Sequence, residues 1–371
     1  MNSSPVSSIL IVKTSAIGDV IQAFPAVEYL RSKFPNAQID WVVEEGIAPL
    51  LKSHPLIDHV IPIRTKAWRK KPFHNQTHIE FRAFVKQLRS TSYDLLFDLQ
   101  GNGKSGVVTA FAKAACKIGF GWRSVREKWN LLATNRWVNP PSSENIRLKY
   151  LGLVQNCFES EVFHSRGIKL KISEQEKERL DVLCKEVPNR SGPRLMVCFG
   201  SKWPNKRLAE ETLLSLLEKI SNTSDPSYIF IFADEEEKRF AEQCASHFKE
   251  RACAVGDLTL PLWQALMWEV DGVIAVDSAA LHLCGTTQTP SFSVFGSSSA
   301  SFYKPSEERH EAVQGPCPYG RVFSARCPVL RTCATGACIR NLQADPLFEA
   351  YQLWFCKWCL PQCSKKGSRA T

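Results

Sequence analysis

The stretch SILIVKTSAIGDV, residues 8–20, decides how the rest of the chain is interpreted. Its first five residues are typical of a buried strand, and the turn that follows ends in Gly18 and Asp19 before a helix-like run. In an open α/β sheet, ligands bind at the carboxyl ends of the strands, which is where Asp19 falls. Aspartate is also a preferred N-cap residue, and the turn taken alone favours the cap.

Strand-like and helix-like segments alternate on both sides of a break near residue 172. Strands are predicted at 8–12, 38–43, 60–63, 93–99, 117–120, 194–199, 228–233, 272–276 and 291–295. Helices are predicted at 20–34, 47–53, 77–90, 105–115, 144–156, 173–187, 209–220, 236–248 and 260–268, with a helix start at 279–284. Ser173 and Glu176 have the spacing of a capping box at the start of one of them. This alternation is typical of parallel sheets covered by helices.

A length of 371 residues exceeds what one hydrophobic core usually supports. We therefore predict an α/β protein with two Rossmann-like domains facing each other across a cleft. The domains are expected at 1–172 and 173–345, followed by a cysteine-rich helical tail at 346–371.

The composition, 44% hydrophobic and 23% charged, is typical of a globular protein. No apolar run is long enough to span a membrane, and the N-terminus lacks the basic region of a signal peptide, so a cytoplasmic protein is expected. The net charge of +10 favours an acidic partner: nucleic acid, an anionic membrane surface or a phosphorylated substrate.

Three strand-to-loop segments of the second half share an anion-binding chemistry: VCFGSKWPNKR (197–207), FADEEE (232–237) and VIAVDSAALH (273–282). In the first, glycine and serine allow close approach to an anion and two lysines supply charge, although a solvated basic loop fits equally well. In the second, an acidic side chain could accept from ribose hydroxyls, or merely favour a helix start. In the third, the free N–H groups of a helix start suit a diphosphate. There, Asp277 could serve only as a cap, and His282 could be an ordinary buried histidine.

The segment RTKAWRKK, residues 64–71, carries five positive charges and no acid. A solvated loop is the usual explanation of such a run. The tryptophan inside it, and further cations at Arg123, Arg126 and Arg147, favour a role in binding an anionic acceptor or lipid headgroups.

An ordered set of motifs resembles glycosyltransferase family 9, the bacterial lipopolysaccharide heptosyltransferases, and within it the heptosyltransferase I group. The motifs are KTSAIGD (13–19), WVVEEG (41–46), WRK (68–70), DLQG (98–101), RE (126–127) and DSAALH (277–282).

The resemblance implies a GT-B fold, with the acceptor on the first domain and the nucleotide-sugar donor mainly on the second. It implies an inverting, metal-independent transfer from ADP-heptose to the Kdo region of lipid A core, at the cytoplasmic face of the inner membrane. The implied partners are therefore an ADP-sugar, an anionic Kdo–lipid A acceptor and, transiently, that membrane. We expect no nucleic acid partner, a monomer and no cofactor.

By position, the resemblance implies that Asp19 is the general base and that Lys206 binds the donor phosphates and stabilises departing ADP. Further donor-binding residues are Ser201, Lys202, Glu235, Asp277, Ser278, Ala279 and His282. The acceptor-binding residues are Arg64, Lys66, Arg69, Lys70, Gln100, Arg126 and Arg147. Lys202 rivals Lys206 because the loop departs from the family pattern, and the ribose-binding glutamate is uncertain by one or two residues. Ala279 stands where the family usually has glycine, so the donor could differ.

Seven of the fourteen cysteines crowd the last 55 residues: Cys317, Cys327, Cys333, Cys338, Cys356, Cys359 and Cys363. Free thiols are the favoured interpretation, with structural zinc at Cys356, Cys359 and Cys363 as the alternative. The amphipathic segment 346–359 is expected to pack on the first domain through Leu347, Tyr351, Leu353 and Trp354.

Two alternatives stay open at this point. One is a family member that uses a different nucleotide sugar or acceptor. The other is a non-enzymatic nucleic-acid-binding protein, which the net charge favours and the concentration of that charge in one segment disfavours.

Overall fold

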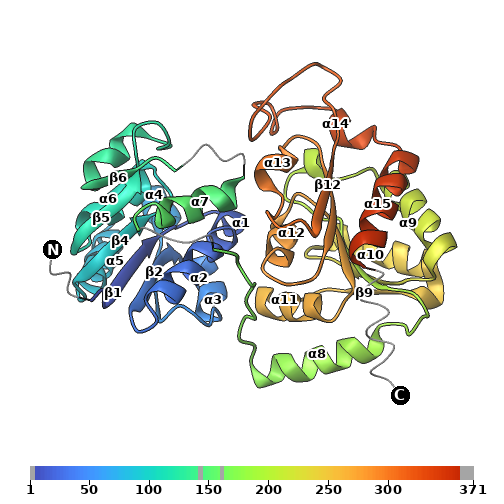
Figure 1. Ribbon diagram of the computed structural model, residues 1–371, viewed down its shortest axis with the longest axis horizontal. Helices are drawn as coiled ribbons and strands as arrows, with labels where there is room; N and C mark the ends of the chain where they lie inside the picture. Colours follow the sequence, from blue (N-terminus) through green and yellow to red (C-terminus); the bar gives the residue numbers. More distant parts are fainter. Residues whose placement is uncertain (1–4, 141–144, 159–162, 360–371) are drawn as a thin grey trace. The chain divides into compact units, whose positions relative to one another are not determined.

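The computed structural model describes residues 5–140, 145–158 and 163–359 (Figure 1). The chain forms two compact units, Met1–Lys171 and Ile172–Thr371. Each unit contains one six-stranded sheet whose neighbouring strands are all parallel. This arrangement confirms the predicted α/β class.

The first unit has the strand order β3-β2-β1-β4-β5-β6. Its strands are β1 (Ser8–Val12), β2 (Gln38–Glu44), β3 (His59–Ile63), β4 (Tyr93–Asp98), β5 (Ala114–Phe120) and β6 (Arg136–Val138). Its α-helices are α1 (Ile17–Ile21), α2 (Phe24–Lys33), α3 (Ala48–Lys52), α4 (Thr65–Lys70), α5 (Asn75–Leu88), α6 (Gly103–Phe111) and α7 (Ile146–Gln155). Two 3-10 helices, η1 (Glu45–Ile47) and η2 (Lys128–Ala133), complete it.

The second unit has the strand order β12-β11-β10-β7-β8-β9. Its strands are β7 (Arg194–Cys198), β8 (Ser227–Ile231), β9 (Ala252–Val255), β10 (Gly272–Val276), β11 (Ser291–Phe295) and β12 (His310–Gln314). Its helices begin with α8 (Glu174–Glu186), η3 (Pro204–Lys206), α9 (Glu210–Ser224), α10 (Glu235–Phe248), η4 (Lys249–Arg251) and α11 (Leu260–Trp268). They end with α12 (Ala279–Cys284), α13 (Ala300–Tyr303), α14 (Ala337–Arg340) and α15 (Ala344–Trp358).

Each sheet has one point where the strand order reverses. In the first unit it lies between β1 and β4, and in the second between β10 and β7. The loops that leave two such strands diverge, which opens a crevice at the carboxyl ends of the strands. The sheet topology therefore places the loops after β1 and β4, and those after β7 and β10, where ligands bind in such folds.

Several elements match the prediction and others differ. The capping box of Ser173 and Glu176 at the start of α8 is confirmed. The helix predicted at 20–34 is divided into α1 and α2, and Pro25, which lacks an N–H, lies in the first turn of α2. The basic segment predicted as a loop forms α4. The edge strands β6, β9 and β12 were not predicted, because they are short and only partly buried.

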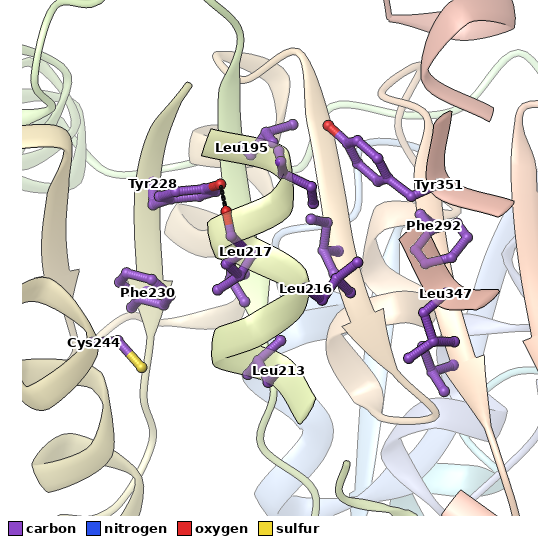
Figure 2. Packing of buried hydrophobic residues seen from close by; sticks show 14 of the residues in the cluster. Leu195, Leu213, Leu216, Leu217, Tyr228, Phe230, Cys244, Phe292, Leu347 and Tyr351 are labelled. Carbon is purple, nitrogen blue, oxygen red and sulfur yellow. Dashed lines mark hydrogen bonds between the residues drawn. The ribbon is translucent and has the colours of Figure 1, made fainter. Parts of the chain in front are cut away.

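Helix α15 packs beside α9 and belongs to the core of the second unit (Figure 1). Figure 2 shows Leu347 and Tyr351 of α15 among Leu216, Leu217 and other buried side chains of this core. The expectation that this helix packs on the first domain is wrong, because Leu347, Tyr351 and Trp354 lie in the core of the second unit. Leu353 is 77% exposed and is not part of that core. Among the described residues, none of the helices combines the length and apolar character that a bilayer crossing requires.

The replacement Trp354→Ala tests the packing of α15. The side chain is 1% exposed, and its Nε1 donates to the carbonyl of Arg309 at 3.1 Å. The cavity should lower the free energy of unfolding of the second unit by about 3–5 kcal/mol in urea denaturation. The neighbouring change Leu353→Ala is the control, with an expected effect below about 0.5 kcal/mol. Equal effects of the two changes would contradict this packing.

Candidate functional site

In the second unit, polar side chains from three segments meet at the carboxylate of Asp277. Asp277 follows β10 directly and is 4% exposed. One of its oxygens, Oδ2, accepts hydrogen bonds from Lys206 Nζ and Ser298 Oγ, and the other lies 3.5 Å from His282 Nε2. Because β10 and β7 flank the reversal of strand order, this cluster occupies the position where a ligand is expected.

Asp277 is held as an anion in spite of its burial. Burial alone would raise its pKa, but the charges of Lys206 and His282 and the hydrogen bonds from Lys206 and Ser298 outweigh that effect. The pKa of Asp277 is therefore below its ordinary value. The carboxylate in turn fixes the position of the Lys206 ammonium.

A second cation, Arg326, lies over the same aromatic ring as Lys206, that of Tyr303. Lys206 Nζ lies 5.9 Å from the ring centroid and the guanidinium carbon of Arg326 lies 4.9 Å from it. An antiparallel bridge between Ser298 and Arg326 holds the backbone there. In the part of the chain that the structure describes, Arg326 forms no ion pair with an acid, so positive charge exceeds negative charge around Asp277.

Sequence reasoning missed Ser298, Tyr303 and Arg326. Arg326 lies beyond the motifs of the resemblance, and nothing in its local sequence distinguishes it from other surface arginines. Ser298 could have been found, because it follows the apolar strand β11 just as Asp277 follows β10.

The loop after β7 brings Lys206 and Ser201 into the site. Lys206 is 8% and Ser201 7% exposed, whereas the Lys202 side chain is exposed to solvent. Gly200 lies directly against Glu237, because a Cβ at Gly200 would collide with that carboxylate. The loop thus packs on α10.

Of the acidic residues after β8, Glu237 is the one buried against this loop, whereas Glu236 is exposed and pairs with Arg207 at 2.8 Å. Glu237 Oε2 accepts from the N–H of Ala233 at 2.9 Å, and burial raises the pKa of the Glu237 carboxyl. Asp234 caps α10 by accepting from the N–H of Glu237, and Glu235 is exposed. Glu237 therefore becomes a second candidate for ribose binding, two residues beyond the predicted Glu235.

The start of α12 lies beside Asp277. Ser278 is its N-cap and Ala279 its first residue. The Ser278 hydroxyl is buried and has no hydrogen-bond partner among the described residues. A buried hydroxyl without a partner is costly unless a ligand or water satisfies it.

In the first unit, Asp19 is the third residue of α1 and is half-buried. Its Oδ2 accepts from the N–H of Ala16, the N-cap residue, at 3.3 Å. Asp19 is thus part of the cap without being the N-cap residue itself. This contact fixes the carboxylate at the carboxyl end of β1.

A buried lysine accompanies Asp19. Lys13 is 3% exposed and its Nζ lies 4.7 Å from the centroid of the Tyr150 ring. Burial lowers the pKa of Lys13, although the charges of Asp19 and Asp98 oppose this change. Lys13 belongs to the motif KTSAIGD (13–19), but no role was predicted for it from the sequence.

Gln100 ties the turn after β1 to the end of β4. Its Oε1 accepts from the N–H of Thr14 at 2.7 Å and from the Thr14 hydroxyl at 2.9 Å. From α6, Lys104 Nζ donates to Ser15 Oγ and to Glu44, both at 3.0 Å. The turn that carries Asp19 is therefore held from two sides, by Gln100 and by Lys104.

The predicted acceptor-binding cations differ in their environments. Three of them are exposed on α4: Lys66, Arg69 and Lys70. Arg64 forms ion pairs with Glu45 at 3.2 Å and Glu80 at 2.8 Å.

The other two cations lie outside α4. Arg126 is exposed, and the backbone beside it is bonded to the Gly101 carbonyl through the N–H of Glu127 at 3.0 Å. Arg147 is only 1% exposed. It is therefore part of the interior of the first unit.

Four cysteines line one cavity of about 360 Å³ in the second unit: Cys317, Cys327, Cys333 and Cys338. Within the described ranges, no three His, Cys, Asp or Glu side chains are grouped so that they could hold a metal ion. Cys359 is buried and its thiol donates to the Asp271 carbonyl at 3.4 Å, while Cys363 lies outside the described residues. Zinc at Cys356, Cys359 and Cys363 stays an untested prediction.

The sequence pattern of glycosyltransferase family 9 (heptosyltransferase) matches residues 81–331. Lipopolysaccharide heptosyltransferase 1 of Pseudomonas aeruginosa is 27% identical over 297 residues, which cover 79% of this chain and 80% of that protein. The enzyme of the same name from Escherichia coli K12 is 37% identical over 128 residues, 34% of this chain and 40% of that one.

Solved structures share the fold. Heptosyltransferase WaaC of E. coli with ADP gives a TM-score of 0.73 at 22% identity and covers 94% of this chain and 99% of that one. A family 9 glycosyltransferase from Veillonella parvula gives 0.73 at 14% identity, with coverage of 96% and 100%. The predicted GT-B class is confirmed by these similarities. Because the family pattern spans more than half of the sequence, this chain belongs to glycosyltransferase family 9 and is a glycosyltransferase.

Proposed function

We propose that the protein transfers a heptose from ADP-heptose to the Kdo region of the lipopolysaccharide inner core, with inversion and without a metal ion. The names of the curated relatives support this substrate class. So does an E. coli heptosyltransferase structure with ADP-2-deoxy-2-fluoro heptose, which has a TM-score of 0.68 at 23% identity. The observation that carries the proposal is the excess of positive charge around Asp277.

The donor site is proposed to bind the diphosphate through Lys206 and Arg326. These two cations approach one ring, that of Tyr303, and of the two only Lys206 is paired with the carboxylate of Asp277. A diphosphate would supply the missing negative charge, and the unsatisfied Ser278 hydroxyl would find an acceptor in it. Glu237 or Glu235 would accept hydrogen bonds from the ribose.

Asp19 is proposed to act as the general base. It removes the proton from the acceptor hydroxyl while that oxygen forms a bond to the anomeric carbon and the bond to the diphosphate breaks. ADP leaves with the bonding electrons, and Lys206 stabilises its developing charge.

The acceptor is proposed to be an anionic, lipid-linked saccharide at the cytoplasmic face of the inner membrane. Lys66, Arg69, Lys70 and Arg126 expose the charge that such a substrate requires. A different sugar or acceptor is the second candidate, because Ala279 replaces the usual glycine. A non-enzymatic nucleic-acid-binding protein is ruled out as an alternative, because the chain belongs to an enzyme family.

The replacement Asp19→Asn tests the base. The amide oxygen can still accept from Ala16, so α1 should keep its cap, but the side chain can no longer take a proton. We expect kcat to fall by about 10²–10⁴-fold in a transfer assay. ADP affinity by calorimetry and the melting temperature are the controls, and both should stay unchanged. Wild-type turnover in this variant would contradict the assignment.

The pair Lys206→Met and Lys202→Met decides between the two lysines. Loss of the buried ammonium should weaken ADP binding about 10–100-fold, the value of a hydrogen bond to a charged group, whereas Lys202→Met should change it little. Because Lys206→Met leaves Asp277 buried and unpaired, the double variant with Asp277→Asn should recover thermal stability but not ADP affinity. Stronger weakening by Lys202→Met would reverse the assignment.

The replacement Arg326→Gln tests the second cation. We expect ADP affinity to fall about tenfold, because a charge-assisted contact to phosphate is lost. Arg321→Gln, an exposed change in the same segment, serves as the matched control. Equal affinities of the two variants in calorimetry would remove Arg326 from the donor site.

A further inference from the structure

The exposed tryptophans of the protein are concentrated in one short segment. Of the ten tryptophans, those with more than half of the side chain exposed are Trp122 (64%), Trp129 (78%) and Trp137 (58%). Leu132, between them in the chain, is 82% exposed. Exposed apolar side chains are ordinary when isolated, but a group of this size marks an interaction surface.

These four side chains belong to one local surface. Trp129 and Leu132 lie on η2. Lys128, also on η2, donates to the carbonyl of Trp122 and places its Nζ 4.5 Å from the centroid of that ring. Trp137 of β6 donates from Nε1 to Thr134 Oγ1, at the end of η2, at 3.0 Å. We call Trp122, Trp129, Leu132 and Trp137 the tryptophan surface.

Helix α6 packs against η2 and also exposes apolar side chains. Gly106 packs against η2 so closely that a Cβ there would lie 3.3 Å from Asn130 Nδ2. The same helix exposes Val107 (51%) and Phe111 (39%). Of these two side chains, Phe111 packs against Phe81 of α5.

Cations alternate with these aromatic side chains. Residues 122–137 contain four cations, Arg123, Arg126, Lys128 and Arg136, against the single acid Glu127. The carboxylate of Glu127 is already engaged with the N–H of Gly103 at 2.8 Å. The segment is thus both apolar and positively charged.

We propose that the tryptophan surface docks on an anionic phospholipid bilayer. Tryptophan rings favour the headgroup level of a membrane, and neighbouring lysines and arginines attract anionic lipids. A second copy of the chain fits this surface less well, because a symmetric contact would bring like charges together. The proposal rests on the proposed function in one respect, since a lipid-linked acceptor must be met at a membrane.

Co-sedimentation with vesicles tests the proposal. The full chain should bind vesicles of phosphatidylcholine and phosphatidylglycerol more tightly than vesicles of phosphatidylcholine alone, and salt should weaken the binding. The double variant Trp129→Ser/Leu132→Ser should lose affinity about tenfold or more, because two apolar side chains no longer enter the interface. Lys128→Glu should lower the affinity for the anionic vesicles selectively. The control is Val182→Ser/Leu353→Ser, which alters two exposed apolar side chains of the second unit.

Two further readouts separate this inference from the proposed function. ADP binding and transfer to a detergent-solubilised acceptor should be the same in Trp129→Ser/Leu132→Ser and in the wild type. Transfer without vesicle binding by the wild type would overturn the docking surface and leave the proposed function intact. Vesicle binding without transfer would overturn the proposed function and leave the docking surface intact. Wild-type vesicle affinity in the variant, or a dimer that the variant converts to monomer in sedimentation velocity, would also overturn the inference.

Discussion

The buried ion pair between Asp277 and Lys206 is the interaction on which the proposed donor site depends. Removing two charges from water costs free energy. The attraction between the two charges offsets that cost only when the other hydrogen-bonding positions of both groups are also satisfied. Ser298 donates a hydrogen bond to the Asp277 carboxylate, and His282 contacts its other oxygen. Without the pair, the loop after β7 would lose its anchor, and the Lys206 ammonium would not stay at the reversal of strand order.

The loop after β7, which carries Lys206, is also held by packing and hydrogen bonds away from Asp277. Gly200 leaves room for the Glu237 carboxylate, and Asn205 Nδ2 donates to the carbonyls of Leu330 and Cys333 at 2.9 and 2.8 Å. The cysteine-rich segment is thus attached to the loop that carries Lys206. Arg326 of the same segment lies over the Tyr303 ring, so a segment without family motifs adds a cation to the proposed donor site.

The first unit positions its carboxylate by a related principle. Lys13 is buried near Asp19, and Gln100 uses one oxygen to hold the turn after β1. In both units, a lysine largely removed from water stands near an acid at a reversal of strand order. The exposed charge of α4 and the tryptophan surface also belong to the first unit, which is the unit proposed to bind the lipid-linked acceptor.

The sequence by itself determined the strands β1, β10 and β11, the helices α11 and α12 and the α/β class, because these depend on local periodicity and on apolar runs. It also identified the positions of Asp19 and Asp277, since polar residues directly after buried strands fall at the carboxyl edge of a sheet. It could not choose between Lys202 and Lys206, because both lie in one polar loop. The tertiary structure favours Lys206 in the proposed donor site, through its contact with Asp277, a residue 71 positions away. Ser298, Tyr303 and Arg326 entered the site for the same reason, because burial and charge pairing are properties of the folded chain and leave no periodic signal in its sequence.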